Sequence, residues 1–153
     1  MLKKYLVPLF AVVLASTAGC STLRGDQSSK DLASTGPSVL DIHTNPGTFE
    51  LNRTLHPLTG TEIVASVKDF SSNVTSVTLK FMNLPIEVPM TSAGGGLWRC
   101  ALSEGQLKQL AVAGKTMRYE VQVIAKDAKG VISAGTKTTD VAIKTPDLSS
   151  DVG

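Results

Sequence analysis

The chain is poor in the residue types that most often carry chemistry or covalent cross-links. It has two cysteines, two histidines and one tryptophan in 153 residues, and aromatic residues make up only 5% of it. Two cysteines cannot build the disulfide framework of a small secreted domain. Two histidines without further ligands at regular spacing give no metal-site pattern, and no nucleophile stands beside a base in a recognisable motif. The sequence therefore predicts a protein that is not an enzyme and that needs no cofactor.

The chain also lacks a large excess of positive or negative charge. The chain has 15 Lys and Arg against 13 Asp and Glu, and two of the lysines lie at positions 3 and 4. Without the first 19 residues the balance is 13 against 13. No basic run is interleaved with aromatic residues, so we expect no nucleic-acid partner.

The first 20 residues follow a characteristic order. The two lysines precede an apolar run at 6–14, which is too short for a membrane-spanning helix of about 20 residues. Small residues occupy 16–19, and Cys20 follows them. This order resembles the signal peptide and lipobox of bacterial lipoproteins.

The resemblance implies that residues 1–19 are removed as a signal peptide and that Cys20 carries the acyl chains, palmitate among them. The partner of this segment is then the membrane, reached through a lipid anchor. Ser21, rather than Asp, follows the cysteine, which in Gram-negative lipoproteins implies the outer membrane of the cell envelope. The alternative is cleavage after Ala18 by the ordinary signal peptidase, because 16–18 also fits a small-x-small site. Cys20 would then be a plain cysteine near a soluble N-terminus.

Residues 20–38 are predicted to be the lipidated cysteine and a flexible tether. The stretch from 21 to 38 is polar, without periodicity, and has few large apolar side chains. A flexible chain of that length has a root-mean-square span of about 25 Å. Such a tether would hold a folded domain clear of the lipid headgroups.

From Val39 onward, short runs of alternating apolar and polar residues are divided by turn residues, which is typical of β-strands. The run at 86–90 lies between prolines and suits only an edge strand or an irregular connection. One helix is expected at 103–114, with Ser103 and Gln106 as a capping box and Gly114 at its end. The other expected strands are 39–42, 48–52, 62–68, 74–82, 97–102, 118–126 and 131–144.

The segment from Leu110 to Gly130 resembles the strand F to strand G hairpin of immunoglobulin-like and fibronectin type III-like domains. The resemblance places Tyr119 in a tyrosine corner, in which its hydroxyl bonds to upstream backbone. Asp127 and Gly130 suit the first and fourth positions of a type I turn. We therefore expect an all-β fold: an Ig-like β-sandwich of about seven strands over 39–145, with one short helix before strand F. Residues 146–153 are expected to be a disordered tail.

Two residues of the 97–102 strand have alternative interpretations. Trp98 and Cys100 share one face of a strand with Leu102, which predicts that both lie in the core. Cys100 could otherwise form an intermolecular disulfide or be a reactive thiol. Trp98 could otherwise be an exposed platform for a sugar ring.

These features together predict a membrane-anchored bacterial envelope lipoprotein whose Ig-like domain is a non-catalytic protein-binding or structural module. Its partner would be an envelope protein or the cell wall, and the alternative is a carbohydrate- or cell-wall-binding accessory domain. Loops and free edge strands are the surfaces that such sandwiches use for binding. The candidate surfaces are 43–48, 54–60, 83–96 and 127–130.

Overall fold

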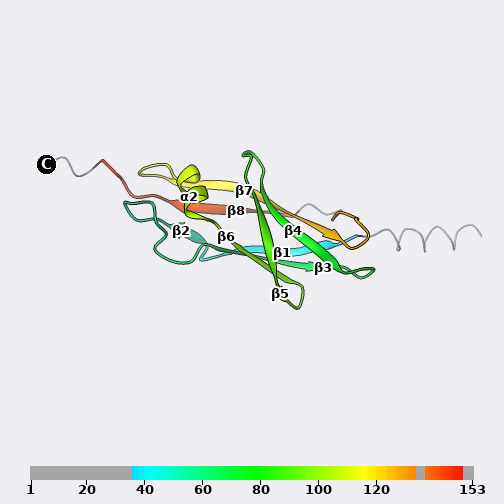
Figure 1. The fold of residues 1–153 in the computed structure, drawn as a ribbon. Coiled ribbons are helices and arrows are strands. Elements are labelled where there is room, and N and C mark those ends of the chain that lie inside the picture. The colour runs from blue at the N-terminus through cyan, green and yellow to red at the C-terminus, as the bar shows by residue number, and fades with distance from the viewer. Residues whose placement is uncertain (1–35, 134–136, 150–153) are drawn as a thin grey trace, which may run out of the picture. The chain divides into compact units, whose positions relative to one another are not determined.

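The computed structural model describes residues 36–133 and 137–149, so Cys20 and the expected tether up to residue 35 lie outside the described residues. The described part holds eight strands and one short helix (Figure 1). Within it, no helix is long and apolar enough to cross a membrane. The elements are β1 (Ser38–Asn45), β2 (Thr48–Glu50), β3 (Glu62–Lys68), β4 (Val74–Phe81), β5 (Glu87–Gly94), β6 (Leu97–Ala101), α2 (Glu104–Leu110), β7 (Thr116–Asp127) and β8 (Thr138–Lys144).

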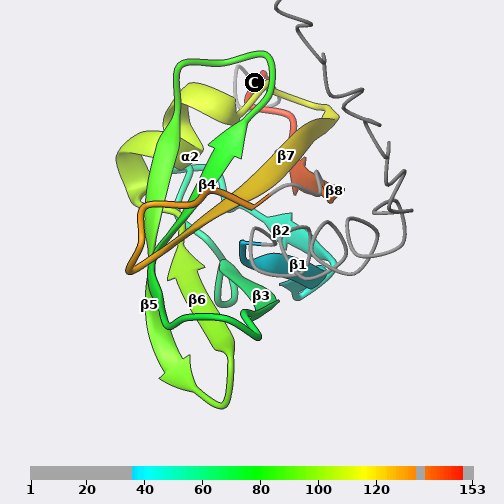
Figure 2. The ribbon, with the colours of Figure 1, turned by 90° about the vertical axis from the view of Figure 1, so that its right-hand side faces the viewer.

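The strands form two layers, which confirms the all-β sandwich (Figure 2). The hydrogen-bonded order is β1-β3-β6-β5-β4-β7-β8-β2. Strand β5 belongs to both layers, because its first half pairs with β4 and its second half pairs with β6. One layer is thus β1, β3 and β6, and the other is β4, β7, β8 and β2. This is the strand arrangement of an immunoglobulin-like sandwich, with β7 and β8 as its F–G hairpin.

Alternate residues of the central strands fill the space between the layers. On β7, for example, Val121, Val123 and Ala125 are buried while Glu120 and Lys126 are exposed. Fully burying one aliphatic side chain contributes about 1.5–3 kcal/mol, so this period of two drives the two layers together. The other fully enclosed core residues include Phe49, Ile63, Val77, Leu79, Phe81, Leu107, Leu110, Val141 and Ile143.

Strand β5 is longer than expected. The sequence predicts only 86–90 here, whereas the strand continues to Gly94. Pro89 faces Thr78 in the pairing with β4 and can donate no backbone hydrogen bond on its other side. The half of β5 that contains Pro89 pairs only with β4 and is an edge there, although β5 as a whole lies between β4 and β6 and is not the edge strand that the sequence predicts. The expected segment 48–52 is a strand only at 48–50, where it runs parallel to β8; with β5 included, the count is eight rather than about seven.

The helix is shorter than the expected 103–114. The capping box of Ser103 and Gln106 is present, but α2 ends at Leu110 and Ala111 is already extended. The Tyr119 hydroxyl donates to the Leu110 carbonyl at 2.6 Å, so this carbonyl is bonded from outside the helix. Gly114 has a positive φ of 69° in the turn that follows and does not end the helix.

The last strand starts later than the expected Val131, because β8 begins at Thr138. Residues 131–133 still accompany β7, since Asp127 N donates to the Val131 carbonyl and Ser133 N donates to the Ala125 carbonyl. Of the expected tail at 146–153, the first residue is held: the Pro146 carbonyl accepts from Gly114 N at 3.0 Å.

The sandwich has two ends, which we name by the direction of the described chain. The amino end, where β1 begins, consists of residues 36–40, 69–73, 94–96 and 127–133. The carboxyl end, where β8 leads out, consists of 51–61, 82–86, 102–115 and 145–149. Figure 1 shows α2 and the end of the chain at one side and the tips of β3 and β7 at the other.

Candidate functional site

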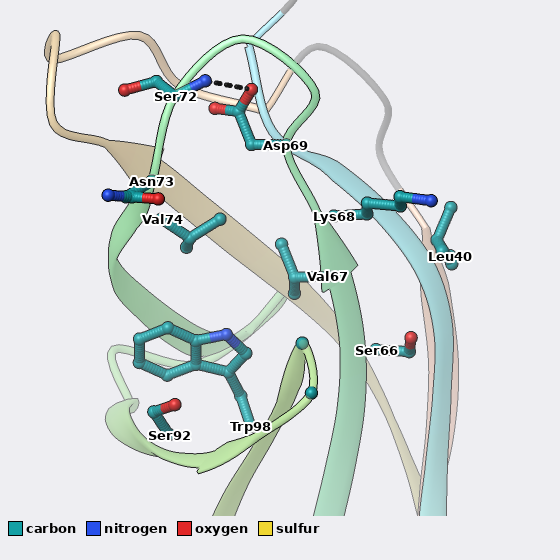
Figure 3. Close-up of a pocket in the computed structure, with 12 residues that line it drawn as sticks. Leu40, Ser66, Val67, Lys68, Asp69, Ser72, Asn73, Val74, Ser92 and Trp98 are labelled. Carbon is teal, nitrogen blue, oxygen red and sulfur yellow. Dashed lines mark hydrogen bonds between the residues drawn. The ribbon is translucent and has the colours of Figure 1, made fainter.

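A groove of about 620 Å³ opens at the amino end (Figure 3). Its walls come from the end of β3, the loop that follows β3, the start of β4 and the hairpin between β5 and β6. A few polar groups within a largely apolar concave surface are typical of ligand sites. This groove is more polar than that, because six polar residues, Lys68 and Asn73 among them, share its lining with the apolar Leu40, Val67, Val74 and Trp98.

Trp98 is the largest side chain in the groove. It pairs with Ala65 across β3 and β6, and Ala65 is fully buried, so both residues face the space between the layers. Trp98 is nevertheless only half-buried, because it lines the groove. Figure 3 shows its indole close to Ser92 and below Val67 and Val74. The residue therefore combines both sequence interpretations: it packs against the core and also lines an open surface.

Three consecutive glycines let the β5–β6 hairpin close tightly against β3. Gly94, Gly95 and Gly96 all have positive φ angles, of 85°, 61° and 81°. The Gly96 carbonyl accepts from Val67 N at 2.8 Å. A Cβ at Gly96 would lie 2.7 Å from the Val67 carbonyl oxygen, so only glycine fits this position without a shift. The hairpin wall of the groove depends on that contact.

The loop after β3 is organised around one carboxylate. Asp69 Oδ1 accepts from Ser71 N at 2.7 Å and from Ser72 N at 3.1 Å. The hydrogen bond from the Ser71 backbone, followed by those from the Ser71 hydroxyl and Ser72, lowers the pKa of Asp69. Lys129 lowers this pKa further by its charge. The carboxylate thus shapes the upper wall of the groove in Figure 3.

The turn after β7 is joined to that loop. Gly130 N donates to the Asp127 carbonyl at 3.1 Å, and Gly130 has a φ of 84°. Asp127 is only 2% exposed, and its Oδ1 accepts from the backbone N–H groups of Lys129 at 2.9 Å and Val131 at 2.7 Å. These are the turn contacts that the sequence assigns to Asp127 and Gly130. Ala128 N donates to the Asn73 carbonyl at 2.9 Å, which joins the turn to the loop.

An exposed aromatic side chain stands at the tip of the same loop. Phe70 is 79% exposed, and the Lys68 ammonium lies 4.4 Å from its ring centroid. Sequence reasoning missed this loop entirely: neither Lys68, Phe70 nor Asn73 was a candidate. The available signal was a large aromatic residue followed directly by the turn-forming run Ser-Ser-Asn at 71–73.

Tyr119 lies at the carboxyl end, away from the groove. Its hydroxyl makes the upstream backbone hydrogen bond that the tyrosine-corner resemblance implies, to Leu110. Its ring meets Phe81 edge-on, with centroids 6.2 Å apart and planes at 62°. Burial raises the pKa of the Tyr119 hydroxyl. Tyr119 connects the end of α2 to the core and does not line the groove.

Cys100 is half-buried beside the core rather than enclosed in it. Burial first, and then the charge of Glu62, raise the pKa of its thiol to about 11. At neutral pH it is therefore protonated and a poor nucleophile. A reactive-thiol role would require the opposite shift.

Neither histidine lines the groove. His43 Nδ1 lies 3.0 Å from Asp41 Oδ2, and His56 Nδ1 lies 2.9 Å from Glu104 Oε1. Over residues 36–133 and 137–149, no three His, Cys, Asp or Glu side chains come together as a metal site would need. Cys20, the predicted lipidation site, is outside the described residues.

No protein-family model and no curated protein matches the chain. Among solved structures, an endo-β-1,4-mannanase from Thermotoga petrophila is similar at 14% identity over 73% of this chain, with a TM-score of 0.39. The chain spans only 20% of that enzyme's length. The PKD1 domain of the Vibrio cholerae metalloprotease PrtV is similar at 13% identity over 72% of this chain and 99% of that domain, with a TM-score of 0.38. The PKD1 domain of Vibrio anguillarum Epp is similar at 16% identity over 74% of this chain and 99% of that domain, with a TM-score of 0.37.

Proposed function

We propose that the chain is a bacterial envelope lipoprotein and that its Ig-like domain is a non-catalytic binding module. Cys20 carries the lipid anchor, and residues 21–35 connect it to the amino end of the sandwich. The groove beside Trp98 is the binding site. An envelope protein is the leading partner.

The groove is the observation that carries this proposal. Its walls belong to strands and to hairpins that are tied by backbone hydrogen bonds, so the site needs little ordering when a ligand binds. An aromatic anchor in a pocket with a polar rim is also the usual centre of a protein interface. Trp98 provides the anchor, and Asn73, Lys68 and Ser92 provide the rim.

A saccharide of the cell wall is the second candidate ligand. The specific observation in its favour is the half-exposed indole of Trp98, with Asn73 and Ser92 lining the same groove. A sugar ring has an apolar face that can stack on an indole and hydroxyls that can bond to such groups. Adding soluble wall fragments while recording the emission of Trp98, the only tryptophan of the chain, tests this ligand directly.

The anchor is tested by fractionating cells that express the Cys20→Ser variant. The proposal expects the unaltered protein in the membrane pellet and the variant outside it, because acylation supplies most of the membrane affinity. A variant that still pellets quantitatively with membranes contradicts the lipid anchor at Cys20.

The binding site is tested by photocrosslinking in intact envelopes. A crosslinking residue at Asn73 faces the groove, and one at Ala113 is a matched exposed control at the carboxyl end. We expect one defined crosslinked product from position 73, lost when Trp98 is changed to Ala, and no such product from position 113. Equal products from both positions contradict the groove as the binding site.

A further inference from the structure

We infer that the amino end of the sandwich itself rests on an anionic lipid surface, as a second membrane contact beside the acylated Cys20. This inference relies on the proposed function for the position of the anchor. The contact would consist of exposed apolar side chains at the tip, surrounded by lysines. This contact would fix the orientation of the domain relative to the bilayer.

The apolar part of this surface comes from three separate segments. Phe70 in the β3–β4 loop is 79% exposed, Ile132 after the β7 turn is 57% exposed, and Leu40 on β1 is 47% exposed. An aromatic ring and two branched aliphatic side chains at the tip of a domain are suited to the boundary between headgroups and acyl chains. Apolar exposure alone does not single out this end, since Leu58 at the carboxyl end is 60% exposed.

The charge around these side chains is what singles the amino end out. The acidic residues of its loops, Asp69 and Asp127, are turned inward and accept backbone N–H groups through Oδ1. The basic residues are on the outside. Lys129 lies in these loops, and Lys68, Lys126 and Lys137 lie directly beside them; all four are exposed, and the exposed acid next to them is Asp41, which is paired with His43. The result is an ammonium-rich rim beside two carboxylates that each accept backbone N–H groups through one oxygen, and such a rim complements an anionic bilayer.

Three of these lysines are also held in place by contacts within the domain. The Lys68 ammonium sits over the Phe70 ring at 4.4 Å, and Lys129 Nζ donates to the Ser71 carbonyl at 3.2 Å. Lys137 Nζ donates to the Leu40 carbonyl. Each therefore stays close to the apolar side chains, where its stem can lie along apolar surface and its head can reach the phosphates.

The course of the chain brings this end to the membrane. A Cβ at Gly36 would lie 2.5 Å from Val131 Cγ1 and 3.2 Å from the Ile132 carbonyl, so the chain leaves the sandwich directly beside the exposed Ile132. Fifteen residues separate Gly36 from Cys20. Even fully extended, they span at most about 55 Å. Anchoring at Cys20 thus keeps the amino end at a high effective concentration near the bilayer, where a weak contact suffices.

Such a contact bears on the choice between the two candidate ligands. The groove opens between the 69–73 loop and the 94–96 hairpin, both at the amino end. If this end lies on the membrane, the groove opens beside the bilayer. That position favours a membrane-associated protein over the wall polymer.

The test uses the full acylated protein in vesicles of phosphatidylcholine, with or without phosphatidylglycerol. A thiol-reactive fluorophore is placed at the amino end by Ala128→Cys or at the carboxyl end by Ala113→Cys; both positions are exposed. Acylation blocks Cys20, and the raised pKa of Cys100 limits its labelling, so the unsubstituted protein gives the background. Quenching by nitroxide-labelled lipids reports how close each fluorophore lies to the bilayer.

We expect strong quenching at position 128 in anionic vesicles and weak quenching at position 113. Changing Phe70 to Ser, or Lys129 to Gln, should reduce the quenching at position 128 about threefold or more. The matched control Leu58→Ser should leave it unchanged. Equal quenching at positions 113 and 128, or no effect of Phe70→Ser, overturns the inference. A protein that does not float with the vesicles and whose Cys20 takes up the label contradicts the lipid anchor instead.

Discussion

Both ends of the sandwich expose large apolar side chains, but their charged residues are arranged differently. At the carboxyl end, Leu58 is exposed, and α2 carries both an exposed acid, Glu104, and an exposed base, Lys108. At the amino end, Phe70 is exposed among lysines, while the carboxylate of Asp127 is turned into the turn that it stabilises. Exposed apolar area alone therefore does not identify a contact surface, and our inference of one at the amino end depends on the charges that surround it.

The ends also differ in how they are closed. The carboxyl end is closed by contacts between distant segments: the Tyr119 hydroxyl bonds to Leu110, and His56 bonds to Glu104. The amino end is built from turns around aspartates and glycines that are joined by backbone hydrogen bonds, such as Ala128 N to the Asn73 carbonyl, and a groove is left between these turns. A closed end stabilises the domain, and an open end can bind. Substitutions at the two ends test this difference between a closed and an open end, in decreasing order of expected effect.

Asp127→Ala should have the largest effect on stability. It removes the acceptor of two backbone N–H groups, those of Lys129 and Val131, at a site that is 2% exposed. Leaving buried donors unpaired costs on the order of 1–3 kcal/mol each, so we expect a loss of about 3 kcal/mol in urea unfolding. The matched control is Asp147→Ala, whose carboxylate bonds to Ser149 in an exposed turn. Its loss should stay below about 1 kcal/mol, and equal losses would remove the distinction between the turns.

Gly96→Ala should come next. The new Cβ would lie 2.7 Å from the Val67 carbonyl oxygen at a φ of 81°, so we expect a loss of about 2 kcal/mol in the free energy of unfolding. Gly95→Ala is the control, because it has a φ of 61° but nothing within 4 Å of the added Cβ. It should lose about 1 kcal/mol. Thermal unfolding of both variants measures the difference, and an equal loss means that the hairpin does not depend on the close approach to β3.

Tyr119→Phe tests how firmly the carboxyl end is closed. The ring contact with Phe81 remains, and only the hydroxyl that donates to Leu110 is lost. We expect a loss of about 1 kcal/mol in urea unfolding, with no change in ligand binding at the amino end. Unchanged stability would mean that this hydrogen bond does not secure α2.

Acidification should weaken the amino-end loop. The pKa of Asp69 is lowered in the folded protein, chiefly by the hydrogen bond from the Ser71 backbone. Its contribution to stability is therefore present above the ordinary aspartate pKa of about 3.9 and is lost as the pH falls through the lower folded value. Asp69→Asn should flatten the fall in stability below about pH 4 in acid titration. A variant with the same acid dependence as the parent contradicts this role.

The smallest effect on folding is expected for Phe70→Ser. Phe70 is 79% exposed and makes no core contact, so unfolding should change by less than about 0.5 kcal/mol. Leu58→Ser, at 60% exposure, should behave alike. The two variants should differ only in the presence of anionic vesicles, where Phe70→Ser alone weakens the contact.

Much of the fold could be predicted from the alternation of apolar residues, since a period of two fixes which face of each strand is buried. The capping box at Ser103 and the turn from Asp127 to Gly130 have local causes, so they could also be predicted from the sequence. The early end of α2 could not be predicted in this way, because it accompanies a hydrogen bond from the Tyr119 hydroxyl to the Leu110 carbonyl, nine residues away.

The groove could be predicted only in part. The alternation places Trp98 on the inner face of its strand, and the structure has it there. That the inner face is open at this point depends on β5 passing from one layer to the other, which no local pattern encodes. Phe70 was missed because a single aromatic residue in a loop has no periodicity to mark it.

The central claim, that the amino end is the membrane-facing end of an anchored binding module, is tested most directly by hydrogen–deuterium exchange. The acylated protein would be compared on anionic vesicles and in detergent. The account predicts slower exchange on vesicles at 69–73 and 128–133, with no change at 54–60 and 111–115. Slower exchange at the carboxyl-end loops, or no difference between the two ends, would contradict it.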